Sequence, residues 1–147
     1  LIARTLSFFN ADVSYYSRTR KPHLEEEYGF KYKNLNSLCE ECDAIFLALN
    51  KNVLLLQEEQ FKLMKGKKML FNTSIGPGFD TKSLAKWLES PNHYFFGDTL
   101  ATIGDLNLWD KENTFTINKS SGGQTYQAYH RLGEKVIQNI NDFLNNK

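Results

Sequence analysis

No apolar run in the 147 residues is long enough to span a lipid bilayer. The longest run, Ala44–Leu49, falls far short of the roughly 20 apolar residues that a transmembrane helix needs. The first residues also lack the basic and apolar regions of a secretion signal. These absences predict a cytoplasmic protein with no membrane partner.

An excess of charge of one sign is also missing. The chain has 18 Lys and Arg against 17 Asp and Glu, a net charge of +1. Nucleic-acid-binding domains usually carry a strongly basic face, so we expect no nucleic-acid partner.

Cysteine is scarce, with Cys39 and Cys42 forming a single CxxC. A zinc site needs a second pair or histidines at ligand spacing, and neither is present. Redox CxxC pairs lie at a helix N-terminus, whereas this pair follows a helical pattern. We therefore expect core cysteines in a reducing compartment and no metal site.

What the chain does have is an alternation of strand-like and helix-like segments. Its length fits one domain. Strands that alternate with helices of about ten residues predict a mainly parallel sheet in an α/β fold. The expected strands are residues 12–19, 44–49, 68–74, 94–98 and 114–117, and a long helix is expected from Tyr126 to Leu144.

The carboxyl ends of parallel strands form the usual ligand site of such a sheet. The first strand ends in Ser17, Arg18, Thr19 and Arg20. An acidic residue at this point suits the free 2′-hydroxyl of NAD, whereas arginine suits the 2′-phosphate of NADP. The turn therefore favours NADP over NAD; the alternative is a solvated basic turn without a ligand.

Five motifs occur in the order and spacing of one enzyme family. They are LIARTLSFFNADVSYYSRT, FKLMKGKKMLFNTS, FDTKSLAKWLES, FFGDT and SSGGQTYQAYHRLGEKVIQNINDFL. Each motif is short, but together they extend from Leu1 to about Leu144. Over this length the chain resembles the coenzyme domain of the D-isomer-specific 2-hydroxyacid dehydrogenases.

The resemblance implies a Rossmann-like three-layer domain. In the family, a first strand and a glycine-rich loop come immediately before the segment that starts here at Leu1. We therefore expect residues 1–147 to be an incomplete dinucleotide-binding domain without a substrate-binding domain. The absent strand would lie beside residues 12–19, and the family dimerises through this domain, so a homo-oligomer is expected.

The resemblance and the strand ends together select ten residues for the cofactor. Asp98 resembles the family's carboxamide-binding aspartate, although it could instead cap its strand. Thr73, like Asn72, could instead fix the end of its strand. The expected cofactor-binding residues are Ser17, Arg18, Thr19, Arg20, Leu49, Asn50, Thr73, Ser74, Asp98 and Gly122.

The catalytic residues of the family have no counterparts here. Family members transfer hydride between a nicotinamide ring and a 2-hydroxy or 2-keto acid, using an arginine, a glutamate and a histidine. Those positions hold Ile75, Ile103 and Lys119. The chain is thus predicted to be the NAD(P)-binding domain of a 2-hydroxyacid dehydrogenase, catalytically incompetent as it stands. The alternative is a degenerate, non-catalytic homologue that acts as a binding or scaffold protein.

Overall fold

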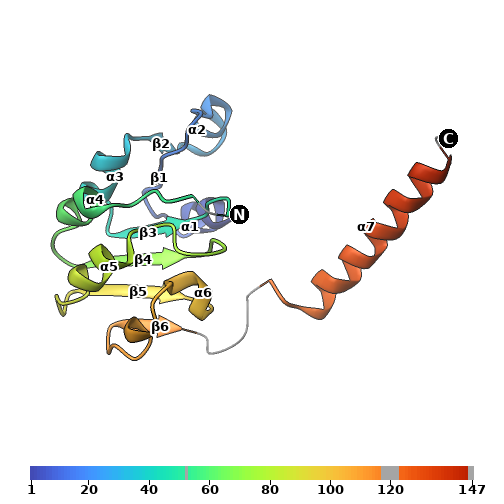
Figure 1. Cartoon of the computed structure of the whole chain (residues 1–147). Coiled ribbons are helices and arrows are strands. Elements are labelled where there is room, and N and C mark those ends of the chain that lie inside the picture. Colours follow the sequence, from blue (N-terminus) through green and yellow to red (C-terminus); the bar gives the residue numbers. More distant parts are fainter. Residues whose placement is uncertain (52, 117–122, 146–147) are drawn as a thin grey trace.

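A four-stranded parallel sheet forms the centre of the structure (Figure 1). The computed structural model describes residues 1–51, 53–116 and 123–145. The strands lie side by side in chain order, and each pairs in parallel with the next. They are β3 (Ala44–Leu47), β4 (Lys68–Asn72), β5 (His93–Gly97) and β6 (Thr114–Thr116). This arrangement confirms the predicted α/β class with a parallel sheet.

Three helices cover one face of this sheet: α3 (Leu35–Glu41), which precedes β3, and α4 (Glu58–Leu63) and α5 (Thr81–Trp87), which connect β3 to β4 and β4 to β5. Polar side chains cap the N-termini of α3 and α5. Asn34 Oδ1 accepts a hydrogen bond from Ser37 N at 2.9 Å at the start of α3. Asp80 accepts one from Ser83 N at 2.8 Å at the start of α5. These caps satisfy amide groups that the first helical turn leaves unpaired.

The hydrophobic core lies between the sheet and these helices. Side chains alternate along a strand, so every second residue of β3, β4 and β5 points to the helices. Leu70 and Phe95 are completely buried on this face, as is Leu84 of α5.

The opposite face of the sheet carries a ladder of stacked phenylalanines, which we call the phenylalanine ladder: Phe46, Phe71, Phe96 and Phe115. The strand register pairs each with the next. Their ring centroids are 4.3, 4.4 and 4.9 Å apart, and the rings are nearly parallel. Phe115, at the sheet edge, is 45% exposed, so this face is less covered than the core face.

A second, two-stranded sheet contains the N-terminal part of the chain. Its strands β1 (Ser14–Tyr15) and β2 (Lys31–Tyr32) pair in parallel. Helices α1 (Ile2–Phe8) and α2 (Pro22–Tyr28) flank β1 in the sequence. The predicted strand over residues 12–19 is therefore shorter than expected. Within the described residues β1 pairs with β2 and not with β3. The edge of β1 opposite to β2 therefore has no strand partner.

The segment after β5 is rich in Asp, Asn and Gly, which are residues typical of loops, yet part of it is helical. It forms α6 (Leu100–Ile103) and a short 3₁₀ helix (Leu106–Leu108). Ile103 and Leu108 are buried in the core, which explains why this segment is ordered into helices.

The last helix, α7 (Tyr126–Asn145), extends away from the sheets (Figure 1). Its apolar side chains are exposed, including Ile137 and Ile140. In the described part of the chain, no helix has the length and apolarity needed to cross a membrane.

Candidate cofactor site

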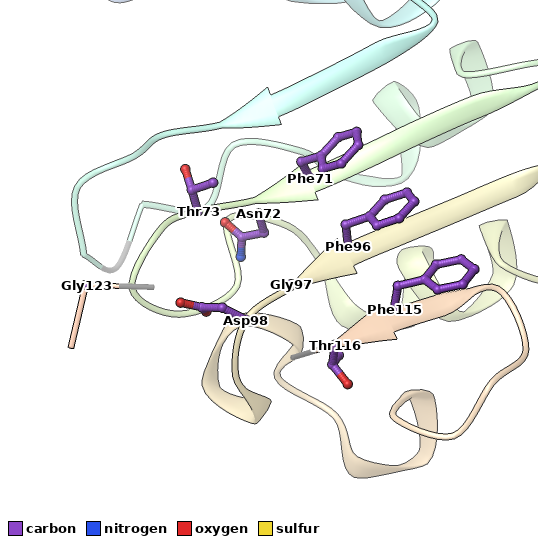
Figure 2. Close-up of a pocket in the computed structure, with 9 residues that line it drawn as sticks. All are labelled: Phe71, Asn72, Thr73, Phe96, Gly97, Asp98, Phe115, Thr116 and Gly123. Carbon is purple, nitrogen blue, oxygen red and sulfur yellow. The ribbon is translucent and has the colours of Figure 1, made fainter. Parts of the chain in front are cut away.

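A cavity of about 540 Å³ opens at the carboxyl ends of β4, β5 and β6 (Figure 2). Three rings of the phenylalanine ladder form an apolar wall, and polar residues lie where the strands end. The lining residues are Phe71, Asn72, Thr73, Phe96, Gly97, Asp98, Phe115, Thr116 and Gly123. An apolar wall beside polar groups suits a ligand that has an apolar ring and a polar substituent.

The end of β4 is fixed by hydrogen bonds from buried side chains. Asn72, 2% exposed, donates through Nδ2 to the carbonyls of Gly76 at 2.9 Å and Thr102 at 2.8 Å. Its Oδ1 accepts from Ser74 N at 3.0 Å. Thr73 Oγ1 donates to Leu47 O at 2.7 Å. The side chains of Asn72 and Thr73 therefore position the strand end, while both residues also line the cavity.

Gly97 and Asp98 form the corresponding end of β5. A side chain at position 97 would bring its Cβ to 2.5 Å from Thr102 Oγ1, so any residue larger than glycine would force the side chain of Thr102 to move. The next residue, Asp98, lines the cavity at its polar end and is half-buried. In Figure 2 it lies near Asn72, beyond the phenylalanine rings.

The turn after β1 contains the four residues predicted to contact the ribose. Ser17 Oγ donates to Thr19 O at 2.6 Å, which closes the turn on itself. Arg18 and Thr19 are exposed. Arg20 is also exposed, but it makes a bidentate ion pair with Glu25. The cofactor roles of these residues remain predictions.

Three further predicted cofactor residues, Leu49, Asn50 and Ser74, follow β3 and β4. Leu49 N donates to Ser74 Oγ at 2.8 Å, so this pair joins the two strand ends. Asn50 is exposed on the following turn. Gly122 lies outside the described residues.

The positions that would hold catalytic residues lie in different environments. Ile75 is 69% exposed. Ile103 is completely buried, and Lys119 lies outside the described residues. The acid nearest to Ile103 in the sequence, Asp105, accepts hydrogen bonds from Asn107 at 2.9 and 3.0 Å and begins the 3₁₀ helix.

The two cysteines occupy apolar surroundings. Cys39 is completely buried, and burial raises the pKa of its thiol to about 11, with a smaller effect of Cys42. A thiol with so high a pKa is a poor nucleophile at neutral pH. Over residues 1–51, 53–116 and 123–145, no group of three or more His, Cys, Asp or Glu side chains could hold a metal ion.

A second cavity, of about 620 Å³, lies between the two sheets. On one side it is lined by Val13 and Ser14, at β1, and on the other by Ala44 and Phe46 of β3. The backbone edges of β1 and β3 that are not paired with β2 or β4 border this groove.

Two features of the site were not anticipated from the sequence. The phenylalanine ladder was missed, although each of the four strands contains at least one phenylalanine. The ion pair of Arg20 was also missed, because it depends on how α2 turns back toward β1.

A known protein family, curated relatives and solved structures match this chain over most of its length. The NAD-binding domain of D-isomer specific 2-hydroxyacid dehydrogenases matches residues 1–115, most of the chain. The chain belongs to this family. Its assignment to the NAD-binding domain of a 2-hydroxyacid dehydrogenase supports a nicotinamide dinucleotide as the cofactor.

Among curated relatives are two glyoxylate reductases. That of Pyrococcus furiosus is 31% identical over 146 residues, and that of Pyrococcus horikoshii is 38% identical over 146 residues. Each match covers 95% of this chain and 43% of the relative. The chain thus spans less than half the length of these family members.

Solved structures show the same Rossmann-type fold. The D-lactate dehydrogenase of Aquifex aeolicus, in complex with NAD and lactic acid, superposes with a TM-score of 0.81 at 21% identity. That match covers 99% of this chain and 50% of the other. The holo form of Rhodotorula graminis D-mandelate dehydrogenase gives a TM-score of 0.84 at 20% identity, over 97% of this chain and 44% of the other.

Proposed function

We propose that this family member binds NADP(H) in preference to NAD(H), with the nicotinamide end in the cavity of Figure 2 and the ribose phosphate at the turn after β1. The observation that carries the proposal is the cavity itself. It lies at the carboxyl ends of parallel strands, and its wall is a stack of phenyl rings with Asp98 at the polar end. These residues fit a nicotinamide ring, because the edges of the stacked phenyl rings offer an apolar contact surface and the Asp98 carboxylate can accept a hydrogen bond from the carboxamide.

The preference for NADP rests on Arg18. Its guanidinium is exposed on a turn that also presents the hydroxyl of Thr19. Arginine binds phosphate through paired, charge-assisted hydrogen bonds, and hydroxyl groups add further donors.

We place the chain with oxidoreductases on CH–OH donors, in which bound cofactor exchanges hydride with a 2-hydroxy or 2-keto acid. The described residues would bind and orient the dinucleotide. They would not complete the reaction alone, because Ile75 cannot bind a substrate carboxylate and buried Ile103 cannot support a general acid. With Lys119 at the third position, the isolated chain should be catalytically incompetent.

A binding or scaffold protein that has lost catalysis is the second candidate. The 69% exposure of Ile75 favours it, because an exposed isoleucine at the substrate position serves contact with another surface better than it serves a carboxylate.

We further propose that the chain associates with itself, as a homodimer or larger homo-oligomer. The groove between the sheets leaves strand edges of β1 and β3 unpaired, and α7 exposes an apolar side. Such surfaces are commonly covered by association. A single monomeric species by light scattering at micromolar concentration would contradict this.

A cytoplasmic location is proposed as well, because both thiols are free.

Calorimetric titration with NADPH and NADH tests the cofactor proposal. We expect NADPH to bind more tightly. Equal affinities would reject the NADP preference, and absence of binding to both would favour the scaffold role. Turnover above about 1 s⁻¹ with any 2-keto acid, a low ordinary enzyme rate, would reject the loss of catalysis.

A further inference from the structure

The two arginines of the turn after β1 differ in their surroundings. Arg20 donates from Nε to Glu25 Oε1 at 2.8 Å and from Nη2 to Glu25 Oε2 at 2.6 Å. Its guanidinium also lies over the ring of Tyr32, 5.7 Å from the centroid. Arg18 is exposed, and the ion pairs found in the described part of the chain do not include it.

Glu25 is itself held in place from β1. Tyr15 Oη donates to Glu25 Oε1 at 2.6 Å and accepts a hydrogen bond from Lys21 N at 2.7 Å. The side chain of Glu25 is 17% exposed, whereas that of Arg20 is 61% exposed. The hydrogen bonds from Arg20 and then Tyr15 lower the pKa of Glu25 to about 2, so the carboxylate is charged at neutral pH.

A phosphate group at this turn would meet both charges of the pair. The carboxylate of Glu25 occupies the two-pronged face of Arg20 that would otherwise bind phosphate oxygens. It also repels a phosphate dianion placed within a few ångströms. Arg18 carries neither restriction.

We propose that Glu25 sets how strongly this turn prefers a phosphorylated ribose, because it engages Arg20 and leaves Arg18 to bind the 2′-phosphate. The inference rests on the proposed NADP(H) binding and assigns the control of its specificity. Glu25 acts here as a positioning residue, and Tyr15 holds it. Removing the charge of Glu25 should therefore strengthen binding of the 2′-phosphate and leave the rest of the nucleotide unaffected.

The test uses two ligands that differ by one phosphate, adenosine 2′,5′-bisphosphate and adenosine 5′-monophosphate. The ratio of their dissociation constants, measured by calorimetry, gives the contribution of the 2′-phosphate to binding. Glu25→Gln should raise the preference for the bisphosphate about threefold to tenfold, since exposed ion pairs are weak but charge-assisted bonds to phosphate are stronger. A merely structural role of Glu25 would weaken both ligands and leave the ratio unchanged.

Glu26→Gln is the matched control. It makes the same change of charge on an exposed position of the same helix, and the hydrogen bonds of Arg20 go to Glu25 instead. Its ratio should stay within about twofold of the wild type, which allows for weak long-range effects. Tyr15→Phe should shift the ratio in the same direction as Glu25→Gln, by less.

The double variant Glu25→Gln/Arg20→Gln completes the design. If Arg20 is the group that Glu25 restrains, most of the gain of Glu25→Gln disappears in the double variant, and only the part that comes from the removed repulsion stays. An unchanged or lowered ratio in folded Glu25→Gln, or a gain that persists undiminished in the double variant, would overturn the inference while the proposed function stands. Failure of every variant and of the wild type to bind either nucleotide would instead reject the proposed function, and the inference with it.

Discussion

The two ends of the proposed cofactor site are built in opposite ways. At the carboxyl ends of β4 and β5, buried Asn72 holds the strand end through hydrogen bonds to Gly76 and Thr102, and there is little room for a side chain at Gly97. At the turn after β1, the side chains are exposed and held by an ion pair and one tyrosine. The comparison indicates that changes at the first end should affect stability, and changes at the second should affect specificity.

The largest effect should come from Asn72→Ala. The change leaves the carbonyls of Gly76 and Thr102 and the amide of Ser74 without their partner. We expect a loss of about 2–4 kcal/mol in the free energy of unfolding, because buried polar groups without partners are costly. Urea unfolding measures it. Asn50→Ala, at an exposed position, should change the same quantity by less than about 0.5 kcal/mol. Similar losses for both would remove the contrast between the two ends.

At the other end, Arg18→Ala should change specificity instead. An arginine–phosphate contact contributes about 1.5–3 kcal/mol, so the preference for NADPH over NADH should fall roughly 10- to 100-fold. Lys21→Ala is the control, because it removes a neighbouring cation that is not on the tip of the turn. Calorimetry gives the affinities, and urea unfolding should show almost unchanged stability. A large loss of stability in Arg18→Ala would contradict the division of roles.

A smaller effect on stability is expected for the cap of α5. Asp80 accepts hydrogen bonds from Ser83 N at 2.8 Å and Ser83 Oγ at 2.6 Å. Asp80→Ala should lower the free energy of unfolding by about 1 kcal/mol. Asp80→Asn, which keeps an acceptor at the cap, should recover most of the loss. If Asp80→Asn were as unstable as Asp80→Ala, the cap would not account for the effect.

The smallest effect is the pH dependence of the turn. The hydrogen bond from Arg20, followed by that from Tyr15, lowers the pKa of Glu25 from 4.5 to about 2 in the folded chain. A lowered pKa stabilises the folded state fully above 4.5, and this stabilisation is lost as the pH falls toward about 2. Over that interval the wild type should lose slightly more stability than Glu25→Gln. The measurement is the free energy of unfolding of both proteins as a function of pH. An equal loss in the two proteins would contradict a stabilising ion pair between Arg20 and Glu25.

Sequence patterns predicted the strands of the larger sheet, most directly β3 and β4, because these contain apolar runs that must be buried. They failed where structure depends on distant partners. The strand predicted over residues 12–19 is short, since among the described residues β1 has a partner, β2, along one edge only. The helix α6 was missed because the Asp- and Gly-rich sequence around it is typical of a loop. Its order comes from the contacts of Ile103 with the core, which the local sequence does not show. For the site, the predicted strand ends indicated where the cavity lies. The pairing of Arg20 with Glu25 could not be predicted, because it depends on how the chain between them turns in three dimensions.

The order of the strands has a consequence for how the molecule folds. Because β3, β4, β5 and β6 neighbour one another both along the chain and in the sheet, each new strand closes a loop of modest length onto the one before. The sheet can therefore grow strand by strand during synthesis. Within the described part of the chain, the sheet of β1 and β2 shares no strand pairing with it, so it should open independently. Amide protons of β1 and β2 should accordingly exchange with deuterium well before those of β4 and β5.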